Sequence, residues 1–297
     1  MPARPSARRP ACLVAFSAAT ALCLLALSPV RVSLATAADT GPSVPPLEIG
    51  YREMYDLQFE AAHQTFREWE RSHSQDPFGP TSNAAAYLFS EFDRLGILQT
   101  EFFVDDDQFR HRERRAPDSE ARDAFYGEMK KSEELANSIL ARSPHDENAL
   151  FAKTLDLGLR SDYSALIEKR YVVSLRDMKS AGLLAEQLLK LNPTDYDVYV
   201  AVGVENYVLG LHAAPVRWLL RAYGAETNKQ KGIEHLELAA AKGHYLAPFA
   251  RLLLAVAALR DNDRNRARQL LQGLAAEFPH NPLYARELAR LQPISGQ

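Results

Sequence analysis

Candidate metal ligands occur in one short segment near the C-terminal end, between two apolar stretches. Asp261, Asp263 and Asn265 alternate along "RDNDRNRAR", the spacing with which a calcium loop presents its oxygen ligands. Such a loop needs glycine at its sixth position and a closing glutamate, but Arg266 occupies the glycine position and no glutamate closes the segment. We therefore interpret the cluster as a polar turn between two helices.

Nucleophilic and acid–base residues form no recognisable catalytic motif. The eight histidines are scattered, no HExxH sequence or paired-carboxylate motif occurs, and His235 and His244 are not spaced as metal ligands on one helical face. Both cysteines, Cys12 and Cys23, lie in an apolar N-terminal segment, so removal of that segment leaves no thiol for a disulfide, catalysis or metal binding. We expect no enzymatic activity, no cofactor and no metal.

The N-terminal segment has the pattern of a secretory signal peptide. Arg4, Arg8 and Arg9 precede the uncharged apolar residues 11–27, and the small-residue site Ala-Thr-Ala follows at residues 35–37. We predict a signal peptide over residues 1–37 and an exported protein, periplasmic or secreted. An uncleaved membrane anchor is the alternative, because the apolar run approaches the lower limit of about 17 residues for a spanning helix.

The charge balance after the signal limits the partners. Residues 38–50, "ADTGPSVPPLEIG", predict a flexible tether. The full chain has 35 basic and 38 acidic residues, and the signal contains four of the arginines and no acid, so the remaining chain has a net charge near −7. An acidic chain is a poor match for a polyanion, and we expect no nucleic acid as partner. We also expect no membrane contact once the signal is removed.

Three segments repeat one spacing of small, apolar and proline residues, at intervals of four, three and five. The segments are Ser132, Ala136, Ile139 and Pro144; Ala181, Ala185, Leu188 and Pro193; and Ala267, Leu271, Leu274 and Pro279. A fourth stretch fits this spacing with Ala62, Phe66 and Trp69, and its proline is displaced to Pro77; Phe59 precedes Ala62 by three residues and extends the aromatic stripe. Such a repeat predicts stacked helix pairs: the small residue lets two helices cross closely, bulky residues fill the joint and proline stops the helix.

These segments resemble the tetratricopeptide repeat (TPR), whose second helix has the same order of small and bulky residues and ends before a proline. The resemblance implies an all-α fold, a right-handed α-solenoid of TPR-like helix hairpins, over residues 51–293. Helices are expected over residues 48–74, 81–98, 118–143, 146–162, 165–191 with a break, 195–211, 214–223, 228–242, 247–260, 263–278 and 282–291. The aromatic stripe of the first helix would be the joint between stacked pairs, with Ala62 at the crossing.

The repeats are longer than the usual TPR length near 34 residues, which predicts inserted helices between the pairs. Candidate insertions are residues 160–177 and 210–230. The second also resembles a segment of the inclusion-body-clearance family of TPR proteins, over residues 210–236. The residues that carry this similarity are Gly210, Pro215, Gly224, Gly232 and Leu236.

In TPR proteins the first helix of each pair lines a concave groove that binds the ligand. The corresponding positions here are almost entirely apolar: Phe151, Leu155, Val200, Val204, Tyr207, Leu252 and Val256. They lack the lysine, arginine and asparagine set with which chaperone-binding TPR proteins hold a peptide carboxylate. Two interpretations remain: the inserted helices fill the groove, or the groove is open and takes an amphipathic helix from a partner.

We predict an exported, non-catalytic TPR scaffold that binds a protein or peptide partner through a curved, largely apolar helical surface. Two alternatives use the same scaffold. A carrier would hold a lipid or another apolar small molecule in a closed helical pocket. A membrane-anchored assembly factor would keep its N-terminal helix.

Overall fold

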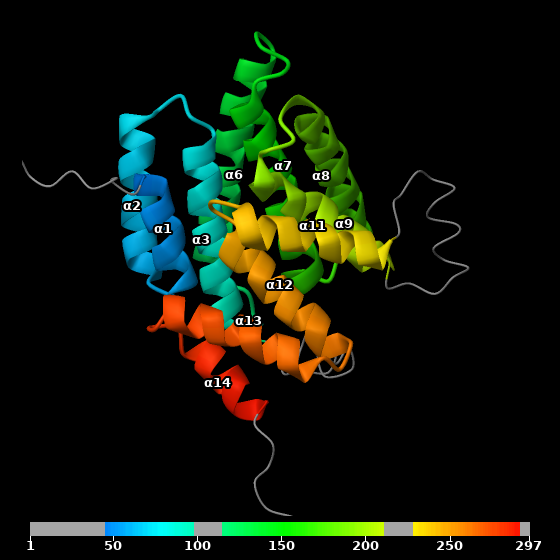
Figure 1. Ribbon diagram of the computed structural model, residues 1–297. Coiled ribbons are helices and arrows are strands. Elements are labelled where there is room, and N and C mark those ends of the chain that lie inside the picture. Colours follow the sequence, from blue (N-terminus) through cyan, green and yellow to red (C-terminus); the bar gives the residue numbers. More distant parts are fainter. Residues whose placement is uncertain (1–44, 98–114, 211–227, 292–297) are drawn as a thin grey trace, which may run out of the picture. The chain divides into compact units, whose positions relative to one another are not determined.

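Helices make up nearly all regular structure in the parts of the chain that the computed structural model describes, residues 45–97, 115–210 and 228–291. These residues contain no strand and belong to one contact unit, residues 44–297 (Figure 1). The prediction of an all-α fold is confirmed. The predicted signal peptide, residues 1–37, and the predicted inserted helix over residues 214–223 lie outside the described residues.

The first helical hairpin differs from the single helix predicted over residues 48–74. It consists of α1 (Pro46–Tyr55) and α2 (Phe59–Ser72). Leu57 between them has a φ of 60°, in the left-handed region, so the helix ends there. The turn contains neither glycine nor proline, and therefore no break was visible in the sequence. α1 also begins inside the predicted tether of residues 38–50, because Pro46 suits the first turn of a helix.

The remaining helices follow the predicted order, with small differences at their ends. They are α3 (Phe78–Arg94), α6 (Ser119–Leu140), α7 (Glu147–Asp162), α8 (Tyr171–Leu191), α9 (Tyr199–Gly210), α11 (Lys229–Lys242), α12 (Ala247–Arg260), α13 (Arg264–Glu277) and α14 (Pro282–Arg290). Short turns of π-helix (Tyr163–Ile167) and 3₁₀-helix (Tyr196–Val198) precede α8 and α9. Among the described helices, none combines the length and the apolar character that crossing a bilayer requires.

Consecutive helices pack against one another as hairpins along the chain. Contacts join α1 with α2, α6 with α7, α7 with α8, α11 with α12 and α12 with α13. The described chain thus has a TPR-like arrangement of helix hairpins. Residues 160–177, one candidate insertion, contain no separate helix: they hold the end of α7, the π-helical turn and the start of α8. Between Pro144 and Pro193 the extra length lies in the π-helical turn and in α8, which has 21 residues.

Polar residues before five helices explain why those helices begin where they do. The side chains of Asp118, Asp146, Asn228, Asp263 and Asn281 accept backbone N–H groups at the starts of α6, α7, α11, α13 and α14. These bonds satisfy donors that have no partner inside a helix. Asp263, the centre of the calcium-like cluster, is therefore a helix cap.

The small residues of the repeated spacing lie where helices cross. Ala62, Ala136, Ala185 and Ala267 have no exposed surface. The bulky members Phe66, Leu188, Leu271 and Leu274 are also fully buried, Ala181 is 3% exposed, and Phe59, Trp69 and Ile139 are partly buried. Pro144, Pro193 and Pro279 follow the ends of α6, α8 and α13, and none of the three is buried.

The first and last hairpins of the described chain contact each other. Arg52 donates to Glu277 Oε1 at 3.0 Å, the backbone N–H of His280 donates to Asp56 Oδ1 at 2.8 Å, and Asn281 Nδ2 donates to the Tyr55 carbonyl at 2.8 Å. More than 200 residues separate these partners in sequence. α1 is thereby held against the C-terminal helices instead of extending as a free end.

Candidate functional site

Several of the predicted groove positions pack against other helices of the same chain. Phe151 is 7% exposed and packs its ring 5.2 Å from that of Phe78 in α3. Val200 and Tyr207 are also buried, while Leu155 and Val204 are partly buried. Across a cavity from Leu155, Val200 and Val204 lie α1 and α3, whereas the Tyr207 ring lies 6.0 Å from Lys229 Nζ of α11.

Leu252 and Val256 of α12 lie apart from the other groove positions. Both are partly buried, and Leu252 lines a separate small space of about 20 Å³ near α14. The structure therefore brings together only Leu155, Val200 and Val204 at one cavity.

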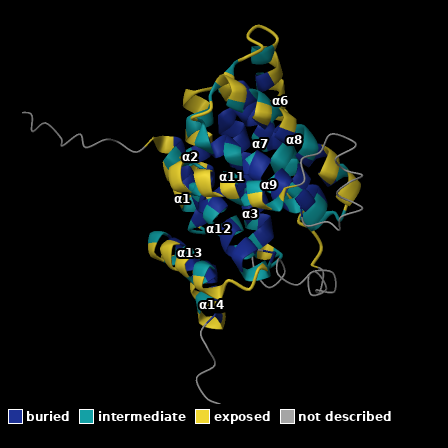
Figure 2. Ribbon diagram, turned by 45° about the vertical axis from the view of Figure 1, so that its right-hand side comes forward, coloured by how far each residue is buried: buried dark blue, intermediate teal, exposed yellow. Residues whose placement is uncertain are grey.

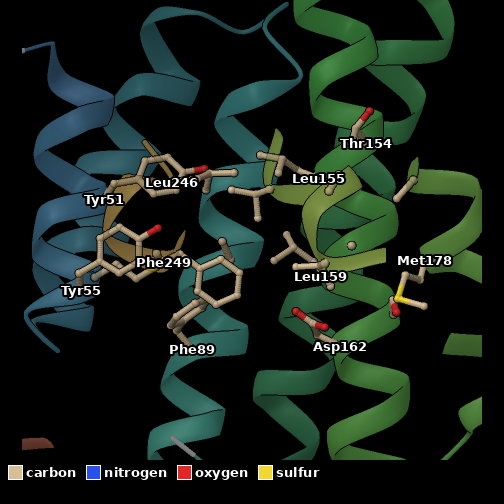
Figure 3. Close-up of a pocket in the computed structure, with 18 residues that line it drawn as sticks. Tyr51, Tyr55, Phe89, Thr154, Leu155, Leu159, Asp162, Met178, Leu246 and Phe249 are labelled. Carbon is tan, nitrogen blue, oxygen red and sulfur yellow. The ribbon is translucent and has the colours of Figure 1, made fainter. Parts of the chain in front are cut away.

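This cavity has a volume of about 90 Å³ and is partly enclosed by six helices, α1, α3, α7, α8, α9 and α12. Figure 3 shows Tyr51, Tyr55, Phe89 and Phe249 on one side and Leu155, Leu159, Asp162 and Met178 on the other. The cavity is thus a mainly apolar space between an aromatic wall and the α7–α8 hairpin.

Hydrogen bonds position the aromatic wall. Ser82 Oγ donates to the Tyr51 hydroxyl at 3.2 Å, and the Tyr55 hydroxyl donates to the Tyr245 carbonyl at 3.1 Å. Burial raises the pKa of both Tyr51 and Tyr55 far above the usual value for a phenol. Both phenols are therefore neutral at physiological pH and contribute no charge to the cavity.

The buried Asp197 fixes the turn that leads to Phe249 of this wall. Its carboxylate accepts the backbone N–H groups of His244, Tyr245 and Leu246 at 2.8 to 3.0 Å. These bonds hold the turn between α11 and α12, from which Leu246 and then Phe249 reach the cavity. A carboxylate with several backbone donors is a strong constraint on a turn.

Asp162 is the one acid among the residues that line the cavity. It is the last residue of α7, and the π-helical turn Tyr163–Ile167 follows it directly. Burial raises the pKa of Asp162 from 3.8 to about 7, and no neighbouring charge or hydrogen bond opposes this effect. Among the described residues, no hydrogen bond or ion pair reaches its carboxyl oxygens.

A second buried carboxyl, Asp156, lies on α7 but outside this cavity. Thr81 Oγ1 donates to Asp156 Oδ1 at 2.9 Å, and Ser132 Oγ donates to Oδ2 at 2.7 Å. Burial raises the pKa of Asp156 to about 7, although both hydrogen bonds lower it. This network joins α3, α6 and α7. Ser132, the first residue of one repeated segment, therefore bonds to a buried carboxyl, which its place in the spacing did not predict.

The calcium-like cluster has local partners. Asp263 Oδ1 accepts the backbone N–H of Arg266, and Asp261 pairs with Lys229. In the described residues no three His, Cys, Asp or Glu side chains are grouped to hold a metal ion.

Exposed apolar side chains collect on one helix of the described chain. The large hydrophobic residues with substantial exposure are Ile49, Tyr171, Val172, Leu175, Leu183, Leu191 and Leu238. Five of these seven belong to α8, where Val172 is 83% exposed and Leu183 is 57% exposed. By contrast, the residues of the neighbouring α7 after Asn148 are all buried or partly buried (Figure 2).

The exposed face of α8 also carries positive charge. Val172, Leu175 and Leu183 occur at helical spacings that place them on one face. Arg176, Lys179 and Lys190 share this face, and Glu186 is its one acid. We refer to these seven residues as the α8 face. Apolar residue spacing in the sequence could have revealed it, but the same spacing is typical of a buried helix side.

Comparisons with known proteins leave the family of this chain unassigned. No protein-family model matches it, and no curated protein matches it. Among solved structures it is similar to a thermophilic TPR protein of Thermus thermophilus, with 14% sequence identity and a TM-score of 0.42. That likeness covers 83% of this chain and 96% of the other.

Two glycines of the segment that resembles the inclusion-body-clearance family have a packing role. A Cβ on Gly232 would meet the Tyr207 backbone nitrogen at 2.5 Å, and one on Gly210 would meet the Lys229 nitrogen at 2.5 Å. Both glycines therefore permit the close crossing of α9 and α11. Pro215 and Gly224 lie outside the described residues.

Proposed function

We propose that the protein is an exported, non-catalytic helical-repeat scaffold that binds a protein partner through the α8 face. The observation that carries this proposal is the concentration of exposed apolar side chains on one helix. Exposed apolar clusters rimmed by polar residues are typical of interaction surfaces. Export is proposed from the signal-like residues 1–37.

The partner that fits this face is an amphipathic helix with acidic residues beside its apolar ridge. Val172, Leu175 and Leu183 supply apolar anchors along about three turns of α8. The three basic residues of the α8 face outnumber its single acid and favour a negatively charged partner. A peptide bound at the predicted groove positions is a weaker proposal, because α3 packs against Phe151 and because α1 and α3 lie across a small cavity from three others.

The cavity gives no support to a lipid carrier. A cavity of about 150 Å³ holds benzene, and the cavity of this protein is about 90 Å³. An acyl chain is longer than this space. A membrane-anchored assembly factor remains a separate proposal that depends on the N-terminal residues, and the intact mass of the protein from its own envelope tests it: cleavage after residue 37 removes the anchor.

The test of the α8 face compares partner capture by three forms of the tagged mature protein. In the Val172→Glu, Leu183→Glu double variant the face loses two apolar anchors and its excess of positive charge, since three acids then balance the three basic residues. The matched control is Leu238→Glu, which changes an exposed leucine of α11 that is not on the α8 face. Circular dichroism first shows that each variant is folded.

We expect the wild type and the control to retain a partner that the double variant loses by at least tenfold. A third variant, Arg176→Glu with Lys179→Glu, should weaken capture and reduce its dependence on salt, because opposite charges steer the partner. Equal capture by the wild type and the folded double variant would show that the α8 face is not the binding surface.

A further inference from the structure

The cavity at the centre of the described helices combines an apolar lining with a single acid. Apart from Asp162, the groups in its lining that can ionise are the phenols of Tyr51 and Tyr55, which are neutral and hydrogen-bonded to other parts of the protein. The charge of the cavity therefore depends on Asp162 alone.

An unpaired carboxylate in such surroundings is unfavourable. Transfer of an ionised carboxylate from water to an apolar environment is costly unless a hydrogen-bond partner or an opposite charge accompanies it. Asp156, on the same helix, has two hydroxyl donors, whereas no described residue supplies a donor to the carboxyl of Asp162. Packing alone would be served better by an apolar residue.

The space beside this carboxyl is kept open by a glycine. Gly158 precedes Asp162 by four residues on α7, so both residues lie on the same side of the helix. A Cβ at Gly158 would meet no atom within 4 Å, and Gly158 lines the cavity. No steric conflict requires glycine here, and glycine inside a helix is less stable than alanine. Its effect is to leave room one turn before the acid.

The backbone at this point is also irregular. α7 changes into a single turn of π-helix immediately after Asp162. Such turns inside helical segments are frequent at functional sites. The acid, the open space and the π-helical turn therefore coincide at one end of the cavity.

We propose that this cavity binds a small organic ammonium ion, with the Asp162 carboxylate as its counter-ion and hydrogen-bond acceptor. The hydrocarbon part of the ion lies against Leu159 and the aromatic wall. Phe89 and Tyr55 present rings on that wall, which offer apolar surface to the hydrocarbon part (Figure 3). The volume of about 90 Å³ suits a group of about four to five non-hydrogen atoms, fewer than the six of benzene, which a cavity of about 150 Å³ holds.

The charge of the ligand follows from the acid. An anionic ligand would be repelled by Asp162, and a neutral apolar ligand would gain nothing from it. An ammonium group brings both the positive charge and the N–H donors that the carboxylate lacks, and such charge-assisted hydrogen bonds are among the strong ones. This site is independent of the α8 face, so either proposal can fail without the other.

The experiment uses n-butylammonium as the probe and titrates it into the protein at pH 8, with binding followed by calorimetry and by protein NMR shifts. Two probes of similar size, neutral 1-butanol and anionic butyrate, test the role of charge. Asp162→Asn keeps the shape of the side chain and removes its charge. Asp195→Asn is the matched control, because burial raises the pKa of Asp195 to about 6 and this residue does not line the cavity.

We expect n-butylammonium to bind the wild type and the Asp195→Asn variant at least tenfold more tightly than it binds Asp162→Asn. Binding to the wild type should strengthen as the pH rises from 6 to 8, because Asp162 ionises while the ammonium keeps its proton and both phenols stay neutral. Equal binding of 1-butanol and n-butylammonium would overturn the recognition of charge, and binding of neither probe would overturn the site.

A second pair of variants tests the place of binding without touching the acid. Gly158→Leu should fill the cavity and abolish binding while the thermal midpoint is retained. Gly127→Leu is the control, since a Cβ at Gly127 also meets no atom within 4 Å but this residue is exposed on α6. Unchanged n-butylammonium binding by folded Gly158→Leu would show that the probe lies elsewhere.

Discussion

Two aspartates on α7 have similar acidity and different surroundings. Burial raises the pKa of both Asp156 and Asp162 to about 7. Asp156 receives hydrogen bonds from Thr81 and Ser132, which join three helices. Asp162 faces the cavity, and no described residue bonds to its carboxyl. The comparison shows that a shifted pKa alone does not identify a functional group; the absence of an internal partner next to open space separates the two.

The surroundings of Asp156 and of Asp162 both depend on how the helices pack. Truncation of a buried side chain at a helix crossing should therefore lower the free energy of unfolding more than any other change. Phe66→Ala removes a fully buried ring at the α1–α2 crossing, where Gly50 faces it. Leu271→Ala removes a fully buried isobutyl side chain in α13. Each should lower the free energy of unfolding by about 2 to 5 kcal/mol. Urea denaturation measures this. A loss below about 0.5 kcal/mol at both sites, the usual range for surface changes, would contradict the helix register.

Removal of the Asp156 carboxyl should show that this acid stabilises the fold. Asp156→Ala leaves the hydroxyls of Thr81 and Ser132 without their acceptor and should cost about 1 to 3 kcal/mol at pH 5. Urea denaturation at that pH measures the loss, with exposed Asp123→Ala as the control. If Asp156→Ala unfolds like its control, the hydrogen-bonded junction is not a structural element and the contrast with Asp162 disappears.

Neutralisation of Asp162 should raise the free energy of unfolding, whereas removal of the Asp156 carboxyl lowers it. The folded-state pKa is raised from 3.8 to about 7, so between these values the unfolded state releases the proton first, and stability falls as the pH rises. Asp162→Asn lacks this loss. Three pKa units correspond to about 4 kcal/mol, and partial exposure of Asp162 reduces the effect, so we expect about 1 to 2 kcal/mol of added stability at pH 8.

The measurement is the difference in unfolding free energy between Asp162→Asn and the wild type at pH 4 and at pH 8. The difference should grow with pH over that interval. A variant that is less stable than the wild type at pH 8 would mean that Asp162 has a stabilising partner, and the comparison with Asp156 would then lose its basis.

The smallest effect is expected at the glycine beside Asp162. Gly158→Ala should stabilise the protein by about 0.5 to 1 kcal/mol, because the new methyl group meets no atom and the helix gains from alanine. Gly232→Ala is the contrast, since its Cβ would collide with the Tyr207 backbone. Thermal midpoints should rise for the first variant and fall for the second; a fall for both would show that the space beside Asp162 is smaller than described.

Local patterns predicted the helices well, because the start and end of a helix depend on residues that are neighbours in the sequence. The prolines after α6, α8 and α13 and the cap at Asp263 are visible in the sequence. The turn at Leu57 was missed because its left-handed backbone has no glycine to mark it. The role of Ser132 was missed because its partners Thr81 and Asp156 are distant along the chain.

The candidate site could be predicted only in part. Leu155, Val200 and Val204 were identified as groove positions, and they line the cavity. The aromatic wall was not, because it comes from α1, α3 and α12, which meet only after folding. Asp162 carried no signal, since an aspartate near the end of a helix is usually a solvated residue.

The sequence by itself determined the helical character, the order of the hairpins and the small residues at their crossings, since these follow from the spacing of apolar side chains within one or two turns. The tertiary structure decided which helices meet around the cavity. Contacts of Arg52 and Asp56 with residues more than 200 positions away hold α1 in place, and α1 lines the cavity together with Asp162. Such contacts depend on the closure of long chain segments, which no local pattern encodes.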